Sequence, residues 1–368
     1  MHRPRRAGIA ISAVISALIA IGTVLAVALL PLVTSIPAQA AGTPTWRLVA
    51  SRHDGPAGNA PGYSVVIAPA PDTAWAFGGT NPGGPSSPTA ARWNGRQWRA
   101  VPLPAALGGF IIAASASSAD NIWAVSYFGS YVLRWNGSRW TVAKKWNAGM
   151  ATSVVAVSSS DVWVFSGSTS LGTLHYNGRS WTRSTGPAGA VYRASALSGS
   201  SIWAVTLHSA TPVEHYSGRS WRRARTGSAL ARTTPDDILA VSPHNIWISG
   251  VSADGRLVIV HGNGARWTRF VAPWQMRPER FAVDGRGGIW VPAVAGGQTW
   301  WILHLSRSGH WTRSKIGLGS GVGDLALIPR TTSLWGSGGS LTKTGGDAAI
   351  WAHGPLPGPA ARAAAPRA

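Results

Sequence analysis

The chain has 368 residues, of which 45% are apolar, and it carries a formal net charge of +21. It contains 21 Trp, 45 Gly and 25 Pro but only 12 acidic residues and no cysteine. Many turn formers and few strong helix formers indicate an all-β chain, and the lack of thiols excludes disulfides and thiolate metal sites. The positive charge favours anionic partners such as envelope polymers, acidic lipid surfaces or nucleic acid.

The first forty residues have the order of a secretory signal. Three arginines precede an uncharged apolar run over 7–30, and Ala38-Gln39-Ala40 fits a small-residue cleavage site. We predict a signal peptide over 1–40, cleaved after Ala40, on a protein that is secreted or held at the cell surface. The apolar run is also long enough to cross a bilayer, so an uncleaved N-terminal membrane anchor is the alternative.

A repeat follows this segment. A short apolar strand around a tryptophan recurs seven times, 40–48 residues apart, at Trp75, Trp123, Trp163, Trp203, Trp247, Trp290 and Trp335. A second tryptophan follows an Asn-Gly or Ser-Gly pair in the first six units, at Trp98, Trp140, Trp181, Trp221, Trp267 and Trp311. Asn-Gly predicts a hairpin, because a type I′ turn needs positive φ at both central residues. Four short strands in about 40–45 residues are typical of one propeller blade.

The seventh unit lacks its fourth strand. It has inner strands near Leu325–Ile328 and Leu334-Trp335 and a third strand around Ile350-Trp351. Residues 45–49, Thr-Trp-Arg-Leu-Val, match the fourth-strand pattern and have no unit of their own; beside Trp351 they would remove an open sheet edge. We therefore predict a seven-bladed β-propeller over 45–353, closed by an N-terminal strand in the last blade, and a disordered Pro/Ala tail over 354–368.

The repeat units carry a family resemblance. Trp93-Asn-Gly-Arg-Gln-Trp98 and Trp135-Asn-Gly-Ser-Arg-Trp140 resemble the repeats of bacterial secreted propellers. Parts of the pattern are similar to tectonin repeats, which implies lectin-type binding, and Asp284-Gly-Arg-Gly-Gly-Ile-Trp290 resembles the blades of bacterial sensor proteins and streptogramin lyases. The hairpins also resemble the Asp-box of sialidases, with Asn or Ser in place of its aspartate. These resemblances imply a fold that hosts many activities.

Seventeen of the 21 tryptophans belong to the repeat, where we expect them to pack between blades. Four remain, in or next to segments that a propeller places on one face: Trp146, Trp274, Trp300 and Trp301. With neighbouring loop residues they could form an aromatic rim at the channel mouth that stacks on sugar rings. The other residues assigned to this rim are Tyr127, Phe128, Tyr131 and Arg277. The alternative is that these side chains only anchor their loops.

Arginine recurs in the hairpins between third and fourth strands, at Arg96, Arg139, Arg179, Arg219 and Arg266. Such a girdle favours polyanions through many weak contacts that salt screens. The equal alternative is protection of the outer strands against edge pairing. Export and the absence of base-reading motifs disfavour nucleic acid.

Candidate catalytic groups are scarce. Glycosidases need two carboxylates about 5–10 Å apart. Asp236-Asp237 precedes an inner strand at a blade entrance, and both glutamates, Glu214 and Glu279, are isolated, so a pair among them is conceivable but unsupported. Histidines at or near the third strands could converge only in a channel lined by those strands, and first strands line a propeller channel. We therefore assign no catalytic residue, no metal and no cofactor.

These features favour a non-catalytic, monomeric binding or scaffold propeller outside the cell that engages glycans or anionic envelope polymers. One alternative is a lyase or glycan-cleaving enzyme with its site at the channel mouth. Another is a tethered platform for a second envelope protein, which would contact the membrane only if the N-terminal segment is retained.

Overall fold

The computed structural model describes residues 34–35, 46–53, 62–79, 87–105, 107–147, 149–168, 170–207, 212–296, 299–316, 320–342 and 345–357. The predicted signal peptide, apart from two residues, and most of the predicted tail lie outside this part of the chain. Among the described residues, no helix is long and apolar enough to span a membrane.

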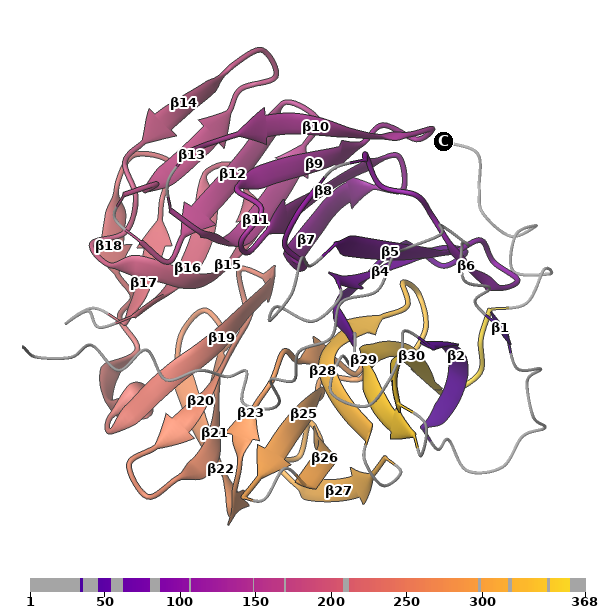
Figure 1. Ribbon diagram of the computed structural model, residues 1–368. Helices are drawn as coiled ribbons and strands as arrows, with labels where there is room; N and C mark the ends of the chain where they lie inside the picture. The colour runs from indigo at the N-terminus through magenta and orange to yellow at the C-terminus, as the bar shows by residue number, and fades with distance from the viewer. Residues whose placement is uncertain are drawn as a thin grey trace, which may run out of the picture.

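Seven antiparallel sheets form the blades of a propeller around a central channel (Figure 1). Blades one to three consist of β3 (Gly62–Ala70), β4 (Thr73–Gly79), β5 (Pro88–Trp93) and β6 (Trp98–Ala100); β7 (Ile111–Ser118), β8 (Asn121–Ser126), β9 (Tyr131–Trp135) and β10 (Trp140–Lys145); and β11 (Ala151–Ser158), β12 (Asp161–Ser166), β13 (Thr173–Tyr176) and β14 (Trp181–Ser184). Each runs outward from the channel as a simple meander, as the repeat predicts.

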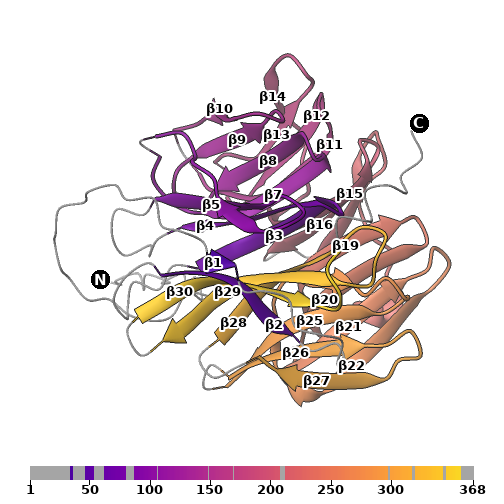
Figure 2. The same cartoon turned by 90° about the vertical axis from the view of Figure 1, so that its right-hand side faces the viewer.

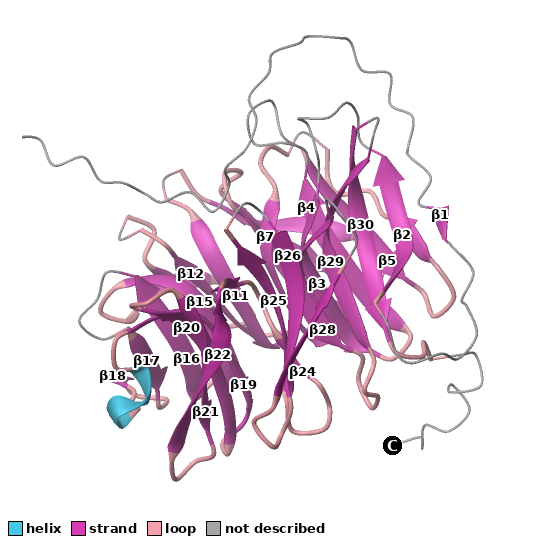
Figure 3. Ribbon diagram, turned by 90° about the horizontal axis from the view of Figure 1, so that it is seen from below, coloured by secondary structure: helices cyan, strands magenta, loops and turns pink. Residues whose placement is uncertain are grey.

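The next three blades repeat the pattern. They consist of β15 (Ala190–Ser198), β16 (Ser201–Leu207), β17 (Val213–Tyr216) and β18 (Trp221–Arg223); β19 (Thr233–Ser242), β20 (Asn245–Ser252), β21 (Arg256–Gly262) and β22 (Trp267–Gln275); and β23 (Arg277–Pro278), β24 (Ala282–Val283), β25 (Ile289–Ala295), β26 (Thr299–Leu305) and β27 (Trp311–Lys315). Blade six differs because its inner strand is split into β23 and β24. A short 3-10 helix, η1 (Gly227–Leu230), follows blade four and is the one helix among the described residues (Figure 3).

Both ends of the propeller contribute to blade seven. β28 (Ser320–Leu327), β29 (Leu334–Thr342) and β30 (Gly345–His353) come from its end, and β2 (Arg47–His53) pairs with β30 in the register Leu48 to Trp351. Figures 1 and 2 show indigo β2 beside yellow β30. A short strand, β1 (Thr34–Ser35), pairs with β2. The predicted closure by an N-terminal strand is confirmed, and it ties the two ends of the ring together.

The outer hairpins form where predicted, but the predicted type I′ turn is wrong. In blade one Trp93 pairs with Trp98, which leaves a four-residue loop. The Oδ1 atom of Asn94 accepts hydrogen bonds from the amides of Arg96 and Gln97 at 3.0 and 3.1 Å. Only Gly95 in this loop has a positive φ, of 87°. The asparagine therefore stabilises the turn as a side-chain acceptor, and the glycine alone supplies the left-handed backbone.

The repeat tryptophans fill the space between blades. Trp75 contacts Trp135 and Trp140 of blade two, with ring centroids 4.9 and 5.2 Å apart. Trp335 of blade seven contacts Trp93 and Trp98 of blade one in the same way. Edge-to-face packing of large flat side chains suits the wedge between adjacent sheets. The core is thus a ring of interfaces between blades.

The inner strands share a β-bulge that positions the candidate site. In six blades the inner strand carries one extra residue close to its start, where its pairing register with the second strand shifts. In blade one, for example, Trp75 pairs with Ile67, and the shift falls between Tyr63 and Val65. The extra residues are Ser64, Ile112, Thr152, Tyr192, Asp236 and Gly323, and the residues after them are Val65, Ala113, Ser153, Arg193, Asp237 and Asp324. In blade six Glu279 and Arg280 occupy these two positions, since Ala282 pairs with Trp290. A bulge bends the strand and redirects its side chains.

Candidate functional site

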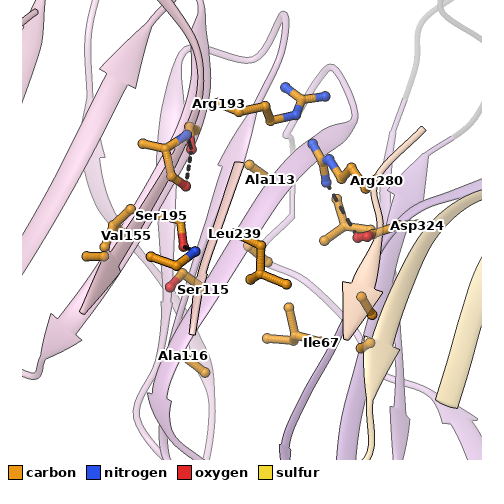
Figure 4. A pocket seen from close by; sticks show the side chains of 18 of the residues that line it. Ile67, Ala113, Ser115, Ala116, Val155, Arg193, Ser195, Leu239, Arg280 and Asp324 are labelled. Atoms are coloured by element: carbon orange, nitrogen blue, oxygen red, sulfur yellow. Dashed lines mark hydrogen bonds and ion pairs between the residues drawn. The ribbon is translucent and has the colours of Figure 1, made fainter. Parts of the chain in front are cut away.

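The inner strands of all seven blades line a channel of about 640 Å³. Most of the wall consists of Ala, Val, Ile, Leu and Ser, but the positions after the bulges carry charge in four blades. Figure 4 shows three of these side chains, Arg193, Arg280 and Asp324, at one end of the channel. Inner strands begin on the face that holds the connections between blades, here called the loop face. The charged end is therefore the loop-face mouth.

The two sides of this mouth differ chemically. Blades one to three present Val65, Ala113 and Ser153 at the ring position. Blades four to seven present Arg, Asp, Arg and Asp in turn, at Arg193, Asp237, Arg280 and Asp324. One side of the mouth is thus small and weakly polar, and the other carries alternating charges.

Two of the ring carboxylates connect neighbouring blades. Asp324 accepts hydrogen bonds from the amides of Val66 in blade one, at 3.0 Å, and of its neighbour Leu325, at 2.8 Å. Asp237 accepts from the amide of Ile238 at 2.8 Å and also has a backbone hydrogen bond with Phe281 of blade six. Burial raises the pKa of both aspartates, that of Asp324 to about 6, against the opposing effect of Arg280. These carboxylates help to hold the ring and are not free to serve a ligand alone.

Arg280 spans the mouth. Its Nη1 atom lies 3.6 Å from Oδ2 of Asp324, and its Nη2 atom donates to the carbonyl oxygen of Ile112 in blade two. Burial lowers the pKa of this guanidinium. Because blade two lies across the ring from blade six, the side chain acts as a crossbar between the charged and the small side of the mouth.

The bulge residues of blades five and six form a second carboxyl pair. Neither Asp236 nor Glu279 has a side-chain hydrogen-bond partner within the described part of the chain. Burial raises the pKa of Asp236 to about 6 and that of Glu279 to about 7, although Arg277 and Arg193 oppose both shifts. The charge of Asp236 adds to the shift of Glu279. Both carboxyls therefore titrate near neutral pH, so each can donate a hydrogen bond when protonated and accept hydrogen bonds when ionised.

Four of the 12 acidic residues thus lie within electrostatic reach of three arginines at the loop-face end of the channel. Asp237, Asp324, Arg193 and Arg280 line the channel there, whereas Asp236 and Glu279 lie next to lining residues without lining it themselves, and Arg277 does not line it either. The sequence pattern left Glu279 isolated, and that interpretation is wrong, because adjacent blades bring it within reach of the charge of Asp236. A positional signal existed. Asp236, Asp237, Glu279 and Asp324 each lie 10 or 11 residues before the repeat tryptophan of their unit. Aligning the units on that tryptophan would have grouped them.

The structure places several predicted rim residues in separate contacts. Trp146 donates from Nε1 to the carbonyl oxygen of Gly149 at 2.9 Å and packs against the core between blades two and three. Tyr131 is buried, and its hydroxyl donates to the carbonyl oxygen of Gly108 at 2.9 Å. The ring of Trp300 lies so close to Gly321 of blade seven that a Cβ there would be 2.8 Å from it. These three side chains anchor their own surroundings.

Other rim residues do come together. Arg313 stacks on Trp274 and on Trp301, with its Cζ atom 4.5 and 4.3 Å from the ring centroids, and Lys315 also lies over Trp301. Cations thus already lie over both rings. Arg277 is exposed in β23 and opposes the rise in the pKa of Asp236 and Glu279, but it does not line the channel.

A cluster of three aromatic side chains lies on the loop face of blade two, in the segments before β7 and after β8. It consists of Phe110, Tyr127 and Phe128, with centroids of Tyr127 and Phe128 4.5 Å apart and Phe128 55% exposed. Phe110 is two residues from Ile112, the partner of Arg280. A flat exposed ring therefore lies on the loop face of blade two, in the loop after β8.

The third-strand histidines support the blades. His175, His215, His261 and His304 stack on the repeat tryptophans of their own blades with centroids 3.9–4.3 Å apart. The Nε2 atom of His175, for example, lies 2.8 Å from Oδ1 of Asp161. No three His, Cys, Asp or Glu side chains in the described ranges are placed to hold a metal ion.

No protein-family model matches the chain, and no curated protein sequence matches it either. Solved structures share its fold. A structure of YCF48 bound to a D1 peptide has a TM-score of 0.59 at 13% identity over 87% of this chain and 97% of that one. The propeller domain of Cps50 (Swd1) from Myceliophteria thermophila has 0.58 at 11%, over 83% and 99%. A GH74 enzyme from Niastella koreensis has 0.57 at 14%, over 79% and 55%. Likeness at these identities establishes the β-propeller fold alone.

Proposed function

We propose that the protein is a non-catalytic binding propeller that acts outside the cell and holds a glycan at the loop-face mouth of its channel. The observation that carries this proposal is the pair of unpartnered carboxyls, Asp236 and Glu279, beside Arg193 and Arg277. The location outside the cell rests on the predicted signal peptide over 1–40.

The chemistry of the mouth suits a ligand rich in hydroxyl groups. Each sugar hydroxyl donates one hydrogen bond and accepts others, so carboxyl and guanidinium groups side by side serve it well. The exposed ring of Phe128 offers a flat apolar surface for the faces of sugar rings. The small side chains of blades one to three leave room opposite the charged groups.

Cleavage of a glycan is the second candidate, and raised carboxyl pKa values favour it. A glycosidase, however, keeps one carboxyl protonated and the other ionised, so its site pushes the two pKa values apart. Here the surroundings raise both, to about 6 and about 7. This parallel shift supports binding over catalysis.

The test is a screen of oligosaccharides on an array, followed by calorimetric titration of the best ligand. We expect the Asp236→Asn, Glu279→Gln double variant to weaken binding by at least about tenfold, since it removes two charge-assisted contacts. Asp254→Asn is the matched control, because this acid is exposed in the loop between β20 and β21 and pairs with Arg256.

Unchanged affinity in the double variant would place the glycan elsewhere on the protein. Failure to bind any oligosaccharide would reject the proposed ligand class. Release of new reducing ends from the bound glycan, lost in the double variant, would replace binding by the glycan-cleaving alternative.

A further inference from the structure

The face opposite the channel mouth is made of tight turns. In a four-stranded meander the turn between the first two strands and the turn between the last two lie at the same end. The glycines of the outer hairpins confirm this contact, since a Cβ at Gly178 or Gly218 would lie 2.6 and 2.9 Å from Ser160 and Ser200 in the inner turns. Both sets of turns therefore share one surface, here called the turn face.

Exposed arginines surround this face. The five hairpin arginines predicted from the sequence are all exposed, and the turns of blades six and seven add three more. The turn-face arginines are Arg96, Arg139, Arg179, Arg219, Arg266, Arg286, Arg307 and Arg330. The sequence pattern did not include the last three, because Arg286 and Arg330 lie in turns between first and second strands and Arg307 lies at a different position of its outer hairpin. With them, every blade contributes at least one cation.

These arginines are available to a partner. None of the eight forms an ion pair with a carboxylate of the described residues. The turn face also carries Asp72, Asp120, Asp161 and Asp284, but His175 and His304 lie 2.8 Å from the carboxylates of Asp161 and Asp284. Eight arginines against four aspartates leave about four positive charges on this face by formal count.

The arrangement favours a long partner over a small one. The arginines sit one or two to a blade around a ring, so a small anion could contact few of them at once. A flexible chain with a charge on each unit could follow the ring and contact many. Guanidinium groups bind phosphate oxygens in a bidentate manner, and phosphate diesters stay ionised at any physiological pH.

We propose that the turn face binds a linear phosphate-bearing polymer that runs over the arginines of successive blades. This site is separate from the channel mouth and does not depend on the glycan proposal. Protection of strand edges explains the arginines less well, because they lie in turns beyond the strand ends, whereas edge pairing is blocked by charges on the outer strands.

Long-chain polyphosphate is the probe, and binding is measured by fluorescence anisotropy at two salt concentrations. We expect binding at low salt that weakens as salt rises, because each arginine–phosphate contact is screened. The variant Arg139→Gln, Arg179→Gln, Arg219→Gln should bind at least about tenfold more weakly at low salt. Surface substitutions of this kind change folding stability little, which thermal unfolding would verify.

The matched control is Arg225→Gln, Arg232→Gln, Arg256→Gln, which removes the same charge from exposed positions on the loop side of blades four and five. It should keep most of the affinity. An equal loss in both triple variants would show that binding follows net charge alone and would overturn the site. Tighter binding of duplex DNA or polyglutamate than of polyphosphate would overturn the chosen partner. Glycan binding should be unchanged in the turn-face variant, so the two proposals fail separately.

Discussion

Replacing Glu279 by glutamine tests whether burial of this carboxyl, when it is ionised, lowers the free energy of unfolding of the protein. Burial raises the pKa of this group from 4.5 to about 7, so the folded protein binds its proton more tightly than the unfolded chain does. The stabilising contribution of that proton is therefore fully present below about pH 4.5 and is lost as the pH rises through about 7. A pKa difference of about 2.5 corresponds to at most about 3 kcal/mol.

Glutamine has nearly the same shape and carries no charge at any pH. We expect the Glu279→Gln variant to match the original protein near about pH 4 and to exceed its free energy of unfolding by about 1–3 kcal/mol near about pH 8. Urea unfolding, followed by the fluorescence of the buried tryptophans, measures both values.

The control for this experiment is Asp254→Asn. A hydrogen bond from Ser252 lowers the pKa of this exposed acid, so its neutral variant should gain no stability at the higher pH. Equal stability of the Glu279→Gln variant and the original protein at both pH values would refute the reasoning. It would mean that the carboxylate is fully compensated by its arginines and is not strained.

Three further predictions concern the ring itself. Ala50→Pro, in the middle of the closing strand, should lower the free energy of unfolding by about 3 kcal/mol or more and yield oligomers on gel filtration; a stable monomer would contradict closure by β2. Trp98→Ala should cost about 3–5 kcal/mol in urea unfolding because its side chain is fully buried, and a loss below about 1 kcal/mol would contradict its role in the core. Arg280→Met should cost about 3–5 kcal/mol near about pH 8 but less near about pH 4, where Asp324 is protonated; the reverse order would refute the crossbar.

The sequence predicted most of the fold because a propeller is periodic. One tryptophan in each unit marked the blades, and a single unpaired segment at Trp46 marked the closing strand that now pairs with β30. Edge pairing is a general requirement of sheets, so it could be applied without coordinates. The turn type could not be predicted in this way. Asn94 stabilises the hairpin by accepting a hydrogen bond on its side chain and does not itself adopt a positive φ.

The channel mouth was decided by the tertiary structure. Asp236 and Glu279 interrupt the apolar pattern of their strands without forming a motif, and they lie far apart in the chain. They come within electrostatic reach because a bulge redirects each side chain and because the consecutive blades five and six pack side by side. Their raised pKa values follow from the same burial. Periodicity determines which residues form a blade, whereas the charge environment at the mouth depends on several blades at once and exists only when the ring is closed.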